Sequence, residues 1–93
     1  MIVMDEARLR TWLELEIDRW CKKSPEELIE ALNFPVAYEQ GAGEEWRQVE
    51  VQLLENTDDY VHVGMAVDDG SEELSRCPLT TSFLVHHDGR IDR

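Results

Sequence analysis

Residues 47–67, RQVEVQLLENTDDYVHVGMAV, decide the fold because they form two strand-like segments on either side of a turn. In the first segment Val49, Val51 and Leu53 alternate with polar residues, and in YVHVGMAV every second residue is Val or Met. A period of two is typical of a strand with one buried face. The NTDD between the segments consists of turn-forming residues. The stretch therefore predicts an antiparallel β-hairpin.

Two helices are predicted ahead of this hairpin, over residues 5–22 and 25–33. In the first, apolar side chains recur three or four residues apart, at Leu9, Leu13, Ile17 and Trp20. The second begins with SPEE, in which Ser24 and Glu27 have the spacing of a capping box and Pro25 suits the first helical position. Each helix is thus expected to bury one apolar stripe.

Further strands are predicted in VAYEQ at 36–40 and TTSFLVHH at 80–87, with a turn signal in the DG that follows. Two helices followed by strands with short links are typical of the α+β class. A chain of 93 residues has no room for two independent cores. The sequence predicts one domain over residues 1–93, with the helix pair packed on one face of a three- to four-stranded antiparallel meander.

The formal net charge of −12 limits the classes of partner. Contacts to nucleic-acid phosphates need Lys or Arg, so direct nucleic-acid binding is not expected. An anionic membrane surface is disfavoured for the same reason. Residues 34–93 hold thirteen acids and four bases, so most of the excess belongs to the strands and their connections. A basic protein surface is the expected partner, and simple solubility is the alternative reading.

The compartment expected from the sequence is the cytoplasm. No apolar run approaches the ~20 residues of a membrane span, and the N-terminus has no pattern of a secretory signal. Cys21 and Cys77 lack metal-site or redox spacing and are expected to be free thiols in a reducing compartment. No cofactor-binding motif is present, and none is predicted.

The adjacent histidines of FLVHHDGR do not form a chelating pair, because neighbouring strand residues point to opposite faces. His86 shares its predicted face with His62 and Glu50. These three side chains are the candidates for a metal or small-ligand site. The alternative is an ordinary polar face with cross-strand pairs.

The acidic connections are the leading candidate for a partner-binding surface. In a meander alternate connections lie at the same end, which would gather six carboxylates: Glu44, Glu45, Asp68, Asp69, Glu72 and Glu73. The opposite end would carry Glu55, Asp58, Asp59 and Asp88. Complementary charge speeds the encounter with a basic partner. Acidic turn-formers also collect in loops for structural reasons alone.

Tryptophans offer a second kind of contact. Trp12 lies with Arg8, Leu15 and Arg19 along one flank of the first helix, and Trp46 begins a strand. Trp and Arg are frequent anchors in interfaces, so this flank is a candidate homodimer contact, with packing inside the domain as the alternative.

These features predict a non-enzymatic, acidic protein-interaction module that binds a basic protein surface. An immunity or inhibitor protein is its most specific form. The competing hypothesis is a small-ligand or metal-binding domain that uses the sheet face around His62 and His86.

Overall fold

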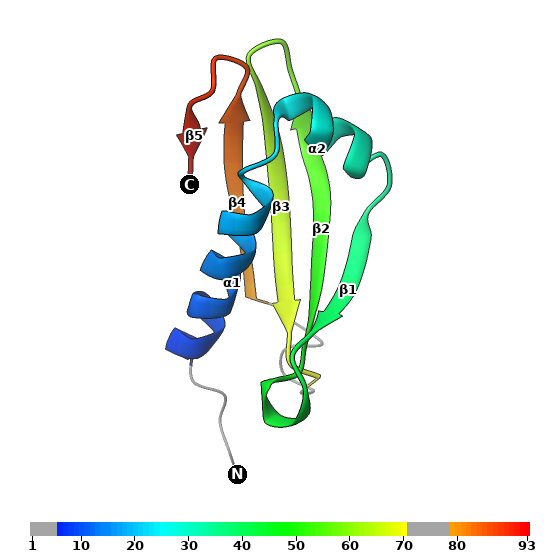
Figure 1. The fold of residues 1–93 in the computed structure, drawn as a ribbon, viewed down its shortest axis with the longest axis vertical. Coiled ribbons are helices and arrows are strands. Elements are labelled where there is room, and N and C mark those ends of the chain that lie inside the picture. The colour runs from blue at the N-terminus through cyan, green and yellow to red at the C-terminus, as the bar shows by residue number, and fades with distance from the viewer. Residues whose placement is uncertain (1–5, 71–78) are drawn as a thin grey trace.

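The computed structural model describes residues 6–70 and 79–93. Its elements, in chain order, are α1 (Glu6–Trp20), α2 (Pro25–Ala31), β1 (Val36–Gln40), the short 3₁₀ helix η1 (Gly43–Glu45), β2 (Arg47–Asn56), β3 (Tyr60–Asp68), β4 (Leu79–His86) and β5 (Ile91–Asp92) (Figure 1). The α+β class is confirmed. The sheet has five strands, whereas three or four were predicted.

The sheet is an antiparallel meander in which each strand pairs with its neighbours in chain order. The predicted hairpin is present, with Val51 opposite Met65 and Val49 opposite Val67. The additional strand is β5, which pairs with the end of β4 after a turn at Gly89. Two residues are too few to display a period of two, so the sequence pattern did not reveal this strand.

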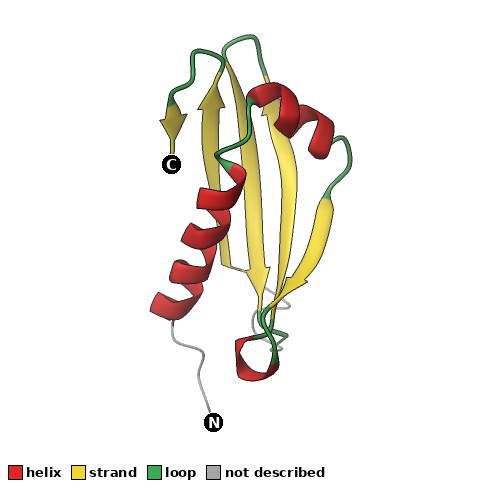
Figure 2. Cartoon of the chain, viewed as in Figure 1, coloured by secondary structure: helices red, strands yellow, loops and turns green. Residues whose placement is uncertain are grey.

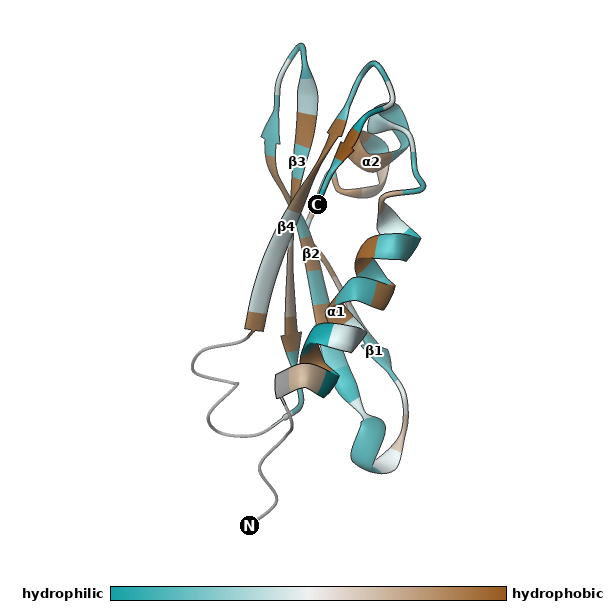
Figure 3. Cartoon of the chain, turned by 90° about the vertical axis from the view of Figure 1, so that its left-hand side faces the viewer, coloured by the Kyte–Doolittle hydropathy of each residue, from teal (hydrophilic) through white to brown (hydrophobic). Residues whose placement is uncertain are grey.

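Both helices pack on the same face of the sheet, as Figure 2 and the turned view of Figure 3 show. Among the described residues, the core between the two layers contains sixteen buried apolar side chains: Leu9, Trp12, Leu13, Ile17, Trp20, Cys21, Leu28, Leu32, Val49, Val51, Val61, Val63, Met65, Val67, Phe83 and Val85. The alternation seen in the sequence thus separates a helix-covered face from a second face on the other side of the strands.

The helix boundaries follow local signals. Helix α2 begins with the predicted capping box: the Ser24 hydroxyl accepts from the Glu27 N–H at 3.1 Å, and the Glu27 carboxylate accepts from the Ser24 N–H at 3.0 Å. Helix α2 ends two residues earlier than predicted, and α1 ends at Trp20 where residue 22 was expected. Residue 5, the predicted start of α1, lies outside the described residues.

One carboxylate, that of Glu16, is part of the core with only 2% of its surface exposed. The Tyr38 hydroxyl donates to Glu16 Oε2 at 2.6 Å, and the Trp20 indole N–H donates to the Tyr38 oxygen at 2.9 Å. Burial, together with the hydrogen bond to Glu16, raises the pKa of Tyr38 to about 12. This chain of hydrogen bonds joins α1 to β1 and satisfies polar groups that would otherwise be buried at a cost.

The structure tests part of what the sequence predicts about the cysteines and about membrane-spanning segments. Cys21 is a free, buried thiol, and Cys77 lies outside the described residues. Within residues 6–70 and 79–93, the structure has no helix of the length and apolar character needed to cross a membrane. The cytoplasmic location stays a prediction.

Candidate functional site

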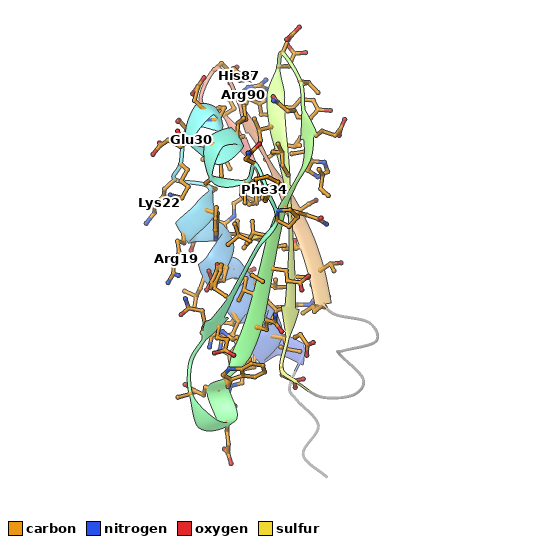
Figure 4. The ribbon with its side chains drawn as sticks, turned by 90° about the vertical axis from the view of Figure 1, so that its right-hand side faces the viewer. Arg19, Lys22, Glu30, Phe34, His87 and Arg90 are labelled. Atoms are coloured by element: carbon orange, nitrogen blue, oxygen red, sulfur yellow. The ribbon has the colours of Figure 1, made fainter. Side chains whose placement is uncertain are left out.

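The face of the sheet opposite the helices is the candidate functional site, and we call it the open face. Its side chains alternate with the core residues along each strand: Ala37, Glu39, Gln48, Glu50, Gln52, Leu54, Glu55, Tyr60, His62, Gly64, Ala66, Asp68, Thr80, Ser82, Leu84, His86 and Asp92. Figures 3 and 4 show from opposite directions that both helices lie on the other side.

The open face is acidic. Its carboxylates are those of Glu39, Glu50, Glu55, Asp68 and Asp92. Arg47 is the only Lys or Arg in the described strands. Its guanidinium lies on the covered side, 4.3 Å from the centre of the Trp12 ring. The strands therefore place carboxylates on the open face with no Lys or Arg among them, which produces a negative potential over that surface.

A groove of about 490 Å³ lies in the middle of this face. Its floor consists of small side chains in two neighbouring rows: Ala66 pairs with Thr80, and Gly64 pairs with Ser82. Because these side chains are short, the backbone of the central strands also lines the groove. Glu50 stands at its side.

One wall of the groove is formed by Leu54, which is 46% exposed. The register of β2 against β3 shifts between Leu53 and Glu55, which is a β-bulge. The bulge turns Leu54 onto the open face, where its side chain lies over Gly64. A Cβ added to Gly64 would be 2.9 Å from Leu54 Cδ1. The bulge thus places a large, exposed apolar side chain beside the small and polar side chains of the groove.

The predicted histidine site is only partly assembled. His62 and His86 share the open face, but each has its own carboxylate: His62 Nδ1 is 3.4 Å from Glu55 and His86 Nε2 is 3.0 Å from Asp92. Glu50 pairs with Ala66, four residues from His62, which is ~13 Å along the strand. In the part of the chain that the structure describes, no group of three or more His, Cys, Asp or Glu could hold a metal ion.

The acidic connections do lie at one end of the sheet, but their carboxylates differ in surroundings. Gln48 pairs with Asp68, so η1 and the end of β3 are neighbours, as Figure 1 shows at the bottom of the sheet. Glu44 is exposed, whereas Glu45 forms an ion pair of 2.6 Å with Arg8 of α1. Glu45 is thereby directed to the helix side and its charge is compensated. Glu72 and Glu73 lie outside the described residues.

Trp12 packs inside the domain, which is the alternative that the sequence left open for the flank of Arg8, Trp12, Leu15 and Arg19. Trp12 is 6% exposed and belongs to the core, with the guanidinium groups of Arg8 and Arg47 over its ring. The buried stripe of α1 is wider than its four apolar residues because it also includes Trp12 and Glu16. A dimer contact through Trp12 would require α1 to leave the sheet, so only Leu15 and the arginines of that flank are available at the surface.

Trp46 is half-buried against the end of β3. A Cβ added to Gly70 would be 3.0 Å from Trp46 Cζ3, so the ring packs on the glycine backbone.

At the opposite end of the sheet, Asp88 forms an ion pair with Arg90 at 3.0 Å, and the backbone N–H of Arg90 lowers the pKa of that carboxyl.

The groove was not predicted from the sequence. The available signal was the pair of small residues at consecutive outward positions of β3, Gly64 and Ala66. Small outward residues in a strand mark a place where another group can approach the backbone closely. Comparison of the chain with models of known protein families, with curated proteins and with solved structures gives no match.

Proposed function

We propose that this protein is a non-enzymatic interaction module that binds a basic segment of another protein on its open face. The observation that carries the proposal is the distribution of charge: the open face of the described strands holds five carboxylates, and none of the described strand residues on that face is Lys or Arg. An acidic surface attracts a basic partner and accelerates the encounter. An immunity or inhibitor role is the most specific form of the proposal.

The same charges disfavour a symmetric dimer through the open face. Two copies that stacked sheet on sheet would bring the Glu50 carboxylates of both toward one interface without a Lys or Arg from the strands to pair with them. Like charges opposite each other destabilise an interface. The sign of the surface therefore favours a different molecule with basic side chains over a second copy of this chain.

The test uses a library of random peptides displayed on phage and selected on the immobilised full chain. The expected result is enrichment of Lys and Arg in the selected peptides, with affinities that fall as the salt concentration rises. Recovery of peptides without a basic bias would contradict the proposal.

Charge reversal then locates the surface. Glu50→Lys should weaken binding of a selected basic peptide by about tenfold or more. Glu30→Lys is the matched control, because Glu30 is exposed on α2, on the covered side (Figure 4). Glu44→Lys tests the connection at the end of the sheet. A loss at Glu44 as large as that at Glu50 would place the partner at the loops and refute the open face as its site.

A further inference from the structure

We propose that the basic segment bound on the open face also carries one bulky apolar side chain, which enters the groove above Ala66, beside Leu54. This inference rests on the proposed function and specifies the class of partner. It distinguishes recognition of a particular kind of peptide from simple attraction of positive charge.

The groove has the size and floor needed for an apolar side chain. Its volume of about 490 Å³ lies in the range of ~300–1,000 Å³ typical of ligand pockets. The floor presents Ala66 and the backbone next to Gly64, both on the central strand β3. Leu54 covers Gly64, but Ala66 and Thr80 carry short side chains, so a partner side chain can approach the sheet closely at that row.

The wall supplied by Leu54 makes the groove apolar where the surrounding face is charged. Leu54 lies over Gly64 and still exposes 46% of its surface. A regular strand would alternate sides here, and the bulge is the reason that Leu54 and Glu55 both lie on the open face. A single exposed leucine is common on protein surfaces, so it is the place of Leu54 as the apolar wall of a groove that indicates an interaction site.

The carboxylates around the groove determine which residues of the partner segment should flank its apolar side chain. Glu50 lines the groove, Asp68 lies toward one end of the strands, and Glu55 lies toward the other. A segment that puts an apolar side chain into the groove therefore passes carboxylates on both sides. Basic residues flanking a central apolar residue complement this arrangement. Interfaces of this kind combine a desolvated apolar anchor with a charged rim.

The experiment compares peptide selections on the wild-type chain and on Leu54→Ser. The wild type should select peptides in which Lys and Arg surround one Trp, Phe or Leu. Leu54→Ser should keep the basic bias and lose the apolar enrichment. Leu15→Ser is the matched control, since Leu15 is 56% exposed on α1 and far from the groove, and it should select as the wild type does.

A second variant, Ala66→Met, fills the groove from its floor and serves if Leu54→Ser disturbs folding, which circular dichroism would reveal. For one selected peptide, replacing its apolar residue by Ala should weaken binding to the wild type about tenfold. The same replacement should leave the affinity for Leu54→Ser and Ala66→Met nearly unchanged, because the groove no longer receives the side chain.

The outcomes separate this inference from the function on which it rests. Basic peptides without apolar enrichment would overturn the inference and leave the proposed function standing. Apolar enrichment that persists in both groove variants would also overturn the inference. Selection of apolar peptides without a basic bias would overturn both and would indicate an apolar ligand. Dimers in sedimentation that Ala66→Met abolishes would identify a second copy as the occupant and would likewise overturn both.

Discussion

Along β4, Phe83 faces the helices and is 1% exposed, whereas the next residue, Leu84, faces the open side and is only partly buried. The same difference runs through the sheet, because its strands present mainly valines to α1 and α2 and mainly polar or small side chains to the other side. The free energy of folding is therefore expected to come mainly from the covered face. The open face is expected to contribute less to stability, so its side chains are freer to serve binding.

The largest difference between the faces should appear when Phe83→Ala is compared with Leu84→Ala. Removing the buried phenyl ring is expected to lower the free energy of unfolding by about 3–5 kcal/mol. Removal of the partly buried leucine should cost less, about 1–2 kcal/mol. Urea denaturation monitored by tryptophan fluorescence measures both. Equal losses would show that the open face contributes to stability as much as the core does.

Loss of the buried hydrogen bonds on the helix-covered side should lower the free energy of unfolding by less than Phe83→Ala does. Tyr38→Phe removes the donor to Glu16 and the acceptor for Trp20, and should cost about 1–3 kcal/mol. Tyr60→Phe is the control on the open face, because its hydroxyl is 3.4 Å from Glu55 in an exposed position. A Tyr60→Phe variant that is destabilised more than Tyr38→Phe would contradict this ranking.

The raised pKa of Tyr38, about 12, gives a pH dependence with a defined sign. Its ordinary value is about 10, so the folded state holds the phenolic proton more tightly than the unfolded chain does. Stability from this group is fully present below pH ~10 and is lost as the pH rises toward about 12. Denaturation midpoints over that interval should fall more for the wild type than for Tyr38→Phe. Parallel curves would argue against the buried hydrogen bond.

The capping box of α2 should contribute less than the core. Ser24→Ala removes the side chain that accepts from the Glu27 N–H and is expected to cost about 1 kcal/mol. The measurement is the shift of the thermal midpoint, with affinity for a selected basic peptide as a second readout. Because α2 lies on the covered side, the affinity should stay unchanged. Weaker binding at a temperature where the variant is fully folded would couple the two faces.

The smallest effect on stability is expected at the floor of the groove. Ala66→Thr puts a β-branched residue into a strand and should change the free energy of unfolding by about 0.5 kcal/mol or less. The added atoms nevertheless enter the groove, so peptide binding should weaken while the thermal midpoint stays nearly constant. Loss of stability comparable to that of Phe83→Ala would mean that the two faces are not independent.

Much of the covered side could be predicted from the sequence because burial imposes a period. The alternation at Val49 and Val51 and the spacing of Leu9 and Leu13 both report a buried surface, and the structure confirms each. The prediction was less complete for Glu16, a charged residue inside the buried stripe whose hydrogen-bond partner is distant in sequence.

The open face was harder to predict because little of it is constrained by packing. The acidic connections were visible in the sequence, but the ion pair of Glu45 with Arg8 joins residues far apart in the chain. The groove depends on which small residues become neighbours, and hence on the register of β3 with β4. The adjacent leucines at 53 and 54 interrupt the alternating polarity, but they can be assigned to a bulge only once the pairing with β3 is known.

Because of the bulge, β2 contains one residue that has no pairing partner on β3. Leu53 pairs with Val63 and Glu55 with His62, which are consecutive on β3. A chain shortened by deletion of residue 54 could therefore keep every other pairing in place and close a regular ladder. Deletion of residue 54 would therefore remove the apolar wall of the groove while the sheet that supports the groove is kept.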